Sequence, residues 1–322
     1  MKLSKAIEGF TIGRTDLSPN TLRSYTYYLN LWLSWRGDDP QLDTLKRNDV
    51  EKFLGYINTQ YRAKHGGPLS QSGRHYCWAA LRSFWAWCEE TMGVENISRK
   101  IPAPKIPDVH VASFTREEIE ALLDACQYTK RADTKTRRSF RMQRPEALRD
   151  TALLLFLLGT GVRIGELCRL KYGHVNLKEK SAEIHPYLSG HKSRARVVWM
   201  GKRAAAVLWK YIAAREEDGE IMDADAPLFA SSSGRGNRPM KPRGVQAVLS
   251  HIGERAKVKN VHAHRFRHTF AIQYLRNGGD PWTLQRLLGH SSSEMTARYL
   301  AMSKQDDKNT HAAASPVDRW RV

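Results

Sequence analysis

A stretch with three prolines, near the end of the first third of the chain, limits the folds available to it. Residues 99–112 read Arg-Lys-Ile-Pro-Ala-Pro-Lys-Ile-Pro-Asp-Val-His-Val-Ala and show no apolar periodicity. Proline prevents a helix from continuing and keeps the chain extended. At 322 residues the chain is long enough for about two domains. We therefore expect two domains, residues 1–100 and 113–322, joined by a linker over residues 101–112.

The first hundred residues carry the periodicity of helices. Ser18-Pro19 is a helix start signal, because serine caps the free amides of the first turn and proline fits its first position. Apolar and aromatic residues then recur at helical spacing from Leu22 to Trp35. Further helices are expected from about Arg47 to Arg62 and around Tyr76–Trp87, and no helical signal precedes residue 18. The pattern therefore predicts that residues 1–100 form a small helical bundle with an aromatic core.

After the linker the pattern is again mainly helical. A new domain is expected to begin with the helix at Thr115, where Thr-Arg-Glu-Glu is a capping box. The apolar segment Ala147–Leu158 predicts a buried helix, and we expect the glycines of Gly159-Thr-Gly161 to break it. Arg163 follows this turn, where another helix begins.

The period changes between residues 182 and 200, which predicts one small β-hairpin. Its strands are expected at Glu183–His185 and Arg196–Met200, with Gly190 to Arg194 in the turn. The fold class is therefore mainly α, with a small β-sheet or hairpin in the second domain. Helices are expected to return over residues 202–216, 243–257, 264–277, 281–289 and 293–302.

The charge of the chain predicts a polyanionic partner. Lysine and arginine outnumber aspartate and glutamate by 52 to 33, giving a formal net charge of +19. Such an excess of positive charge is typical of proteins that bind nucleic acid. The densest stretch, residues 130–149, holds eight basic and two acidic residues. That stretch is equally consistent with a solvated loop and with direct phosphate contacts.

Several protein classes lack support in the sequence. The four cysteines are scattered without a C-x-x-C pair, which argues against a disulfide framework or a structural zinc site. No run approaches 18 apolar residues, so no membrane span is expected. The first residues lack the apolar core of a signal peptide. We expect a cytoplasmic protein without membrane association, cofactor or bound metal.

Four short segments in the second domain carry the candidate chemistry. They are Gly-Thr-Gly-Val-Arg-Ile-Gly-Glu-Leu at 159–167, His-Arg-Phe-Arg-His-Thr at 264–269, Leu-Leu-Gly-His at 287–290, and Tyr299, nine residues after His290. Together they place two arginines, two histidines and a tyrosine in a fixed order. This set can break and rejoin a phosphodiester without a metal, because it holds phosphate ligands, proton carriers and a nucleophile.

Each residue type has a role in such a reaction. Arg163 and Arg267 offer paired donors to the non-bridging oxygens of a phosphate. Ionising a tyrosine with a pKa of about 10 at pH 7 costs about 4 kcal/mol. The attack by Tyr299 therefore needs help, which His264 as proton acceptor and the arginines can give. His290 can donate to a phosphate oxygen. Lys192, in the hairpin turn, can protonate the departing 5′ oxygen as general acid.

A zinc site is the main competing interpretation of the histidines. His264 and His268 are four residues apart, a spacing that can bind zinc on one helix face. No third ligand occurs at an evident spacing, and a zinc site would leave Tyr299 without a role. The catalytic interpretation accounts for all four segments.

At these residues the chain resembles the tyrosine recombinases, the phage-integrase-type site-specific recombinases. The family's marks are Gly-x-Arg-x-x-Glu-Leu, His-x-x-Arg, Leu-Gly-His and a tyrosine nine residues after that histidine. They match Gly161–Leu167, His264–Arg267, Leu288–His290 and Tyr299, and the resemblance covers about residues 112–302. On weaker grounds, residues 1–100 resemble the family's DNA-binding core-binding domain. Residues 113–322 would then be the catalytic domain.

The resemblance implies a reaction and an assembly. The chain would form a C-shaped clamp around double-stranded DNA, and Tyr299 would form a 3′-phosphotyrosine and release a 5′-hydroxyl. A 5′-hydroxyl of a second strand would reverse the link, so neither a nucleotide cofactor nor a metal would be required. The family also acts as a homotetramer on two DNA sites, in which each protomer donates a C-terminal segment to a neighbour. Here that segment would be residues 303–322, with Trp320.

The general acid is the one place where the chain departs from the family. The family's hairpin lysine commonly falls eight residues before a position that resembles Trp199, and that count arrives at His191. Because hairpin turns vary in length, we favour Lys192, with His191 as the alternative. A histidine acid would titrate near neutrality.

Two other functions share parts of this pattern. A type IB topoisomerase-like enzyme cuts and reseals one strand without exchange, using a similar arginine, lysine and tyrosine. A non-catalytic DNA-binding regulator would keep the fold and lose the reaction. The two-domain helical layout and Leu-Gly-His favour recombination over the first, and the complete catalytic set argues against the second. We therefore expect a site-specific DNA recombinase.

Overall fold

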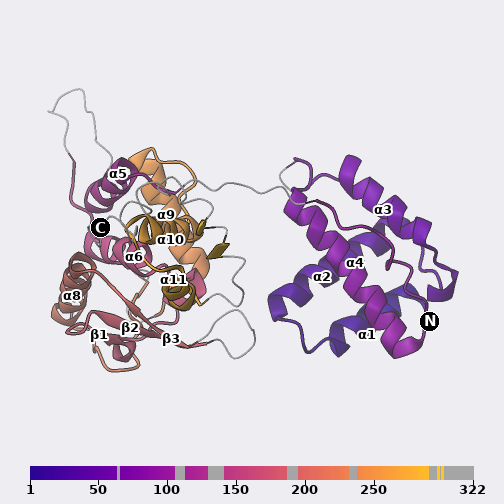
Figure 1. Cartoon of the computed structure of the whole chain (residues 1–322), viewed down its shortest axis with the longest axis horizontal. Coiled ribbons are helices and arrows are strands. Elements are labelled where there is room, and N and C mark those ends of the chain that lie inside the picture. Colours follow the sequence, from indigo (N-terminus) through magenta and orange to yellow (C-terminus); the bar gives the residue numbers. More distant parts are fainter. Residues whose placement is uncertain are drawn as a thin grey trace, which may run out of the picture. The chain divides into compact units, whose positions relative to one another are not determined.

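The chain forms two compact units, Met1–His110 and Val111–Val322 (Figure 1). The computed structural model describes residues 1–63, 66–105, 113–129, 141–186, 195–231, 238–289, 296–297 and 299–300. The predicted linker over 101–112 is therefore described only as far as residue 105, and the tail 303–322 lies outside the described residues.

The N-terminal unit is helical around an aromatic core. Its elements are α1 (Leu3–Gly13), α2 (Pro19–Arg36), the 3-10 helix η1 (Leu42–Thr44), α3 (Arg47–Thr59) and α4 (Gln71–Met92). The predicted start of α2 is confirmed, because the Ser18 side chain accepts a hydrogen bond from the Thr21 amide at 3.2 Å. Trp32 and Trp85 are fully buried and meet edge to face at 6.3 Å between ring centroids. The expected aromatic core is therefore present.

Helix α1 corrects the prediction that no helical signal precedes residue 18. Its N-cap, Lys2, makes no side-chain capping bond, and its first turn holds no acidic residue, so the usual start signals are missing. Leu3, Ile7 and Phe10 nevertheless follow helical spacing and are buried against the rest of the unit. Packing of this apolar face, rather than capping, therefore holds the helix.

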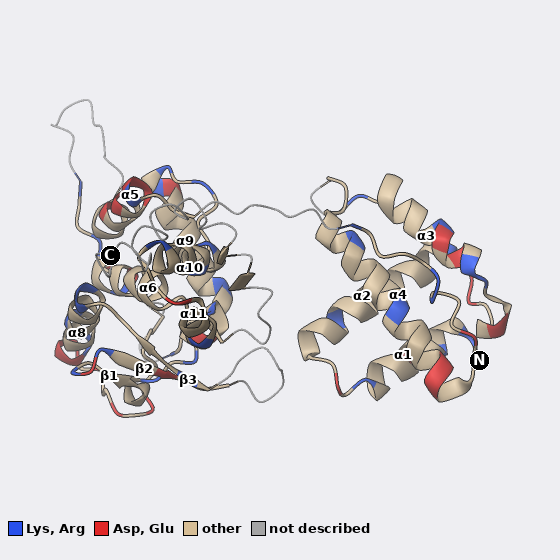
Figure 2. Cartoon of the chain, in the orientation of Figure 1, with Lys and Arg blue, Asp and Glu red and all other residues tan. Residues whose placement is uncertain are grey.

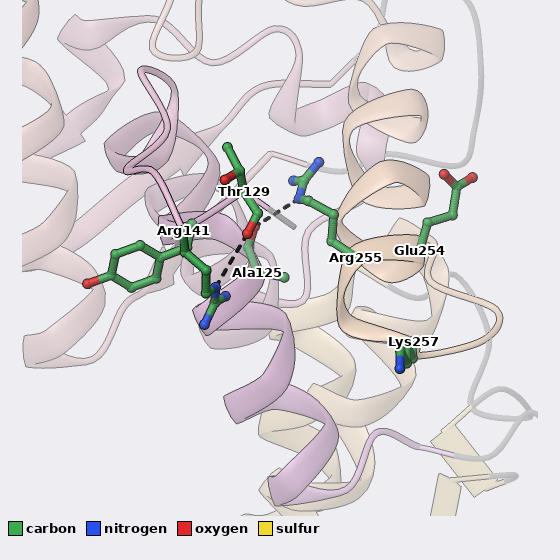
Figure 3. Close-up of a pocket in the computed structure, with 7 residues that line it drawn as sticks. Ala125, Thr129, Arg141, Glu254, Arg255 and Lys257 are labelled. Atoms are coloured by element: carbon green, nitrogen blue, oxygen red, sulfur yellow. Dashed lines mark hydrogen bonds between the residues drawn. The ribbon is translucent and has the colours of Figure 1, made fainter. Parts of the chain in front are cut away.

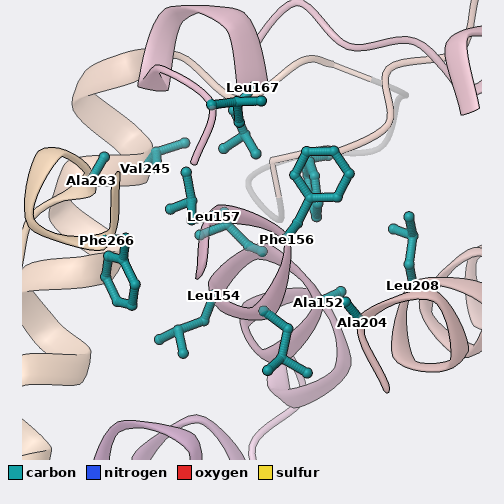
Figure 4. Close-up of a cluster of buried hydrophobic side chains, with 14 of the residues drawn as sticks. Ala152, Leu154, Phe156, Leu157, Leu167, Ala204, Leu208, Val245, Ala263 and Phe266 are labelled. Carbon is teal, nitrogen blue, oxygen red and sulfur yellow. The ribbon is translucent and has the colours of Figure 1, made fainter. Parts of the chain in front are cut away.

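The C-terminal unit is built around the apolar helix α6 (Ala147–Thr160). The helices α5 (Arg116–Gln127), α8 (Lys202–Glu217) and α10 (Ala263–Arg276) pack against it. Figure 4 shows side chains of α6 between Phe266 of α10 and Leu208 of α8. The unit is completed by α7 (Ile164–Leu167), η2 (Tyr172–His174), α9 (Pro242–Ala256) and α11 (Pro281–Leu288).

One of the two glycines expected to break α6 differs from the sequence prediction. Gly159 lies within α6 and does not break it. The helix ends at Gly161, whose φ of 62° is in the left-handed region that glycine adopts readily. The capping box at Thr115 is confirmed, because its hydroxyl accepts from the Glu118 amide and its own amide donates to the Glu118 carboxylate.

A small antiparallel sheet forms one edge of this unit. Its strands are β1 (Val175–Asn176), β2 (Ser181–Ile184) and β3 (Arg196–Trp199), in the order β1-β2-β3. The predicted hairpin is confirmed by the pairing of β2 with β3, in which Ile184 lies opposite Arg196. Strand β1 was not predicted, because two residues are too few to show an alternating pattern. The predicted fold class, mainly α with one small sheet, is confirmed.

Two further observations bear on the expected class of protein. Within the described parts of the chain, no helix has the length and apolar character needed to cross a membrane. Figure 2 shows that basic and acidic residues occur in both units, and that the first turn of α5 holds acidic residues, Glu117 and Glu118.

Candidate active site

The first candidate arginine is placed by the tight turn after α6. A Cβ atom at Gly161 would lie 2.5 Å from a ring carbon of Phe270, so both the positive φ and the lack of space favour glycine. Arg163 then caps α7, and its amide donates to the Glu166 carboxylate at 2.8 Å. The Arg163 guanidinium reaches across to the end of α11, donating at 3.3 Å to the carbonyls of Leu288 and Gly289.

A buried carboxylate braces this arginine. Glu166 is almost fully buried, and Oε1 accepts from Nη1 of Arg163 at 3.3 Å. Arg196, the first residue of β3, donates to both oxygens of the same carboxylate, at 3.0 and 2.7 Å. Glu166 therefore joins two arginines from distant parts of the sequence.

The second candidate arginine is the most deeply placed. Arg267 on α10 is 1% exposed, and donates from Nη1 to the Gly161 carbonyl at 2.8 Å and from Nη2 to the Leu288 carbonyl at 2.7 Å. Burial, with Arg163 nearby, lowers the pKa of Arg267 to about 9. A positive charge held this far from water is poised to interact strongly with an anion.

Three arginines thus converge on the C-terminal end of α11. Arg196 donates from Nε to the Leu287 carbonyl at 2.6 Å, while Arg163 and Arg267 bind the carbonyl that follows. The last carbonyls of a helix have no partner within the helix and carry partial negative charge, so cations are stabilised there. Sequence spacing places His290 directly after this end. The chain that leads to the tyrosine therefore begins at an arginine cluster.

The candidate nucleophile is buried beside these arginines. Tyr299 is 2% exposed and packs with Ala271, Leu284 and Leu288. Burial raises the pKa of the Tyr299 hydroxyl above its ordinary value, while Arg267 and Arg163 act in the opposite direction. Helical backbone at Thr296, Ala297, Tyr299 and Leu300 agrees with the helix predicted over 293–302, of which the other residues lie outside the described ones.

Two histidines of α10 complete a row of rings that ends at the tyrosine. The rings of His264 and His268 are 4.3 Å apart, and those of His268 and Tyr299 are 5.3 Å apart, both edge to face. Partial removal from water, followed by the charge of Arg267, lowers the pKa of His264. Desolvation and the neighbouring His264 lower the pKa of His268 to about 4. Both rings are therefore neutral at pH 7, and neutral His264 can accept a proton.

The structure brings together four of the residues predicted from sequence: Arg163, His264, Arg267 and Tyr299. Lys192, its alternative His191, and His290 lie outside the described residues. Considering only the described residues, no group of three or more histidine, cysteine or acidic side chains is arranged to hold a metal ion.

Three residues of this site were not predicted as site residues from the sequence. Glu166 appeared only as part of a motif, His268 only as a possible zinc ligand, and Arg196 only as a strand residue. One signal was available for Arg196: it lies two positions before the buried Val198, so both side chains share the inward face of β3. A charged residue on an inward face requires a partner.

A separate pocket of about 520 Å³ lies between the C-terminal ends of α5 and α9 and shares no lining residue with this site (Figure 3). There Arg255 donates to the Ala125 carbonyl at 3.1 Å, and Arg141 to the Thr129 carbonyl at 3.3 Å. Arg141 also pairs with Asp124. These arginines interact with the C-terminal end of α5 and the residues after it, so helix capping explains their position.

Comparison with known proteins gives two matching family models. The model described as the phage integrase family matches residues 112–306, which include every residue of the site. The model described as the phage integrase N-terminal SAM-like domain matches residues 10–90, within the N-terminal unit.

Individual relatives are similar over most of the chain. Tyrosine recombinase XerA of Thermococcus kodakarensis is 27% identical over 302 residues, covering 94% of this chain and 92% of the relative. Tyrosine recombinase XerC of Bacillus pumilus is 31% identical over 248 residues, covering 74% and 73%. The Tn1549 transposon integrase, solved in complex with circular intermediate DNA, shares the fold with a TM-score of 0.73 at 18% identity, covering 97% of this chain and 99% of that one.

Proposed function

Since the chain belongs to the phage integrase family and is a site-specific tyrosine recombinase that cleaves and rejoins DNA, we propose that Tyr299 is its nucleophile and that Arg163 and Arg267 bind the scissile phosphate. The observation that carries this proposal is the position of Tyr299 beside two arginines from separate helical segments. A binding protein would have no need of this arrangement.

The arginines stabilise the charge that develops on the phosphate. Arg163 is 29% exposed and makes only long bonds of 3.3 Å to the end of α11, so it can turn to an incoming phosphate oxygen. Arg267 is held by two shorter bonds and acts as a fixed positive charge beside Tyr299. Fixed donors in a dry site stabilise a transition state without reorganisation.

The cleavage step balances with groups of this chain. The Tyr299 oxygen forms a bond to phosphorus as the bond from phosphorus to the 5′ oxygen breaks. The tyrosine proton passes to neutral His264, and Lys192 supplies the proton that the 5′ oxygen needs. His290 donates to a non-bridging oxygen. The phosphodiester energy is kept in the 3′-phosphotyrosine, which a 5′-hydroxyl of another strand then attacks to rejoin the DNA.

Strand exchange between two duplexes sets the number of protomers. Two duplexes have four strands to cleave, and each chain supplies one Tyr299. We therefore propose a homotetramer on two DNA sites, in which residues 303–322 of each protomer bind a neighbour.

Covalent capture of DNA is the experiment that tests this function. We expect the protein, incubated with DNA from its own genomic flanks in EDTA and then denatured in detergent, to remain attached to a DNA 3′ end. EDTA should not lower the yield, because every group in the proposed step is a side chain. Attachment to a 5′ end would rule out the proposed reaction. Tight binding without any attachment would mean either that this DNA lacks the target site or that the chain binds DNA with an inert catalytic set.

The pH dependence of cleavage identifies the general acid. His264 has a lowered pKa and stays neutral above pH 7, so its titration does not change the cleavage rate there. A lysine acid, with an ordinary pKa of about 10.4, stays protonated, and the single-turnover rate should be flat from pH 7 to 8.5. A histidine acid, at about 6.5, would make the rate fall about tenfold per pH unit. We expect the flat profile of Lys192, and a falling one would assign the role to His191.

A further inference from the structure

Arg196 makes several charged contacts near the site, although it belongs to the strand β3. Its side chain is 7% exposed, and it donates to Oε1 and Oε2 of Glu166 from its two Nη atoms. Its Nε donates to the Leu287 carbonyl at 2.6 Å. One guanidinium thus joins the beginning of β3, the short helix α7 and the end of α11.

These contacts link the parts of the site that must act together. Glu166 also accepts from the backbone amide and from Nη1 of Arg163, so Arg163 and Arg196 share one carboxylate. Leu287 is one residue before the carbonyl that Arg163 and Arg267 both bind. The proposed general acid, Lys192, lies four residues before Arg196 in the sequence.

Stability alone is a weak reason for an arginine here. A buried ion pair gains little over apolar side chains of similar volume, because both charges lose their water. The planar guanidinium, in contrast, fixes direction as well as distance, since it donates in a rigid fork. Three bonds from one such group leave β3 with little freedom to move relative to α7.

We propose that Arg196 is a positioning residue of the recombination reaction: its bonds to Glu166 and to the Leu287 carbonyl fix the start of β3 relative to Arg163, so that the general acid reaches the 5′ oxygen of the phosphate that Arg163 holds. This inference rests on the proposed function. It assigns to Arg196 no contact with DNA.

Arg215 offers a matched control within the same unit. Its side chain is 5% exposed, and it binds the Glu220 carboxylate and the carbonyls of Pro227 and Leu228, all at 3.1 Å or less. It is therefore another buried arginine held by one carboxylate and by backbone carbonyls. None of these contacts involves Arg163, Glu166 or α11, so loss of the Arg215 guanidinium should lower stability without displacing the general acid.

The experiment compares Arg196→Lys and Arg215→Lys in the full chain. A lysine keeps the charge but cannot hold two carboxylate oxygens and a carbonyl in fixed directions. We expect Arg196→Lys to lower the single-turnover rate of covalent capture by about 100-fold, as for a catalytic group displaced by about 1 Å. DNA binding should change less than threefold. Arg215→Lys should lower the melting temperature at least as much, with a capture rate within threefold of the parent.

A modified substrate separates positioning of the acid from a general loss of structure. DNA with sulfur in place of the bridging 5′ oxygen releases a thiolate, which leaves without a proton because its conjugate acid is far stronger than an alcohol. On this substrate Arg196→Lys should recover to within about fivefold of the parent chain. If the defect of Arg196→Lys persists on the sulfur substrate, or if Arg215→Lys loses capture equally on the natural one, the proposal is wrong.

A second variant covers the case in which Arg196→Lys does not fold. Glu166→Gln keeps the size of the side chain and one acceptor oxygen, and sulfur should relieve the part of its defect that comes from the general acid. The part that persists belongs to Arg163, which Glu166 also holds. Failure of the inference is distinct from failure of the proposed function. In the first case the parent chain still forms its adduct on both substrates, whereas in the second it forms none.

Discussion

Tyr299→Phe is expected to abolish covalent capture of DNA while leaving DNA binding within about twofold of the parent chain. The substitution removes one oxygen atom, and that oxygen is the atom proposed to attack phosphorus. The ring remains among Ala271, Leu284 and Leu288, so the packing that holds the segment after α11 persists. This hydroxyl lies within the influence of both Arg267 and Arg163. The loss should therefore be complete rather than partial.

A tyrosine of the same cluster provides the control for this variant. Tyr274, on α10, packs against the same group of apolar residues. Tyr274→Phe should keep the full yield of adduct, with a similar small change in melting temperature. The measurement is the fraction of DNA that stays attached to protein after denaturation, at saturating protein. A substantial adduct with Tyr299→Phe would show that another residue is the nucleophile, whereas equal losses in both variants would indicate damage to the cluster.

Sequence patterns reveal a site well where its residues lie close together on one helix. The spacing of His264 and Arg267 places them on one face of α10, and the structure has them there. Tyr299 was predicted on a helix, and its described neighbours are helical. In each case the position of the residue is set by the geometry of a single helix. The periodicity of the sequence is then sufficient to predict that position.

The residues that were overlooked depend on contacts between distant elements. The bond from Arg196 to Glu166 spans 30 residues, and the one from Arg196 to Leu287 spans 91. Nothing local in the sequence of β3 indicates which carboxylate an inward arginine will meet. The same reason explains α1, whose helix depends on packing rather than on a start signal. These features depend on tertiary contacts, which the spacing of residues in the sequence does not reveal.

Arg267→Lys is expected to lower the capture rate by about 100- to 1000-fold at pH 8, the loss typical of removing a fixed donor to transition-state charge. Two effects act together. A lysine nitrogen cannot keep both the Gly161 and the Leu288 carbonyls in the directions that the guanidinium holds. The site also disfavours charge, since it lowers the pKa of Arg267 to about 9. A lysine ordinarily has a pKa of about 10.4, and the same desolvation would lower that pKa toward pH 7.

The second effect gives Arg267→Lys a dependence on pH that the parent chain lacks. A lysine with a lowered pKa is mostly uncharged above that pKa and gains its proton as the pH falls below it. The capture rate of Arg267→Lys, divided by that of the parent at the same pH, should therefore rise between pH 8 and pH 6. Arg276→Lys, an exposed arginine of the same helix, should give a ratio near one throughout. A rate for Arg267→Lys within tenfold of the parent at pH 8 would mean that positive charge at Arg267 contributes little. Phosphate stabilisation would then rest mainly on Arg163.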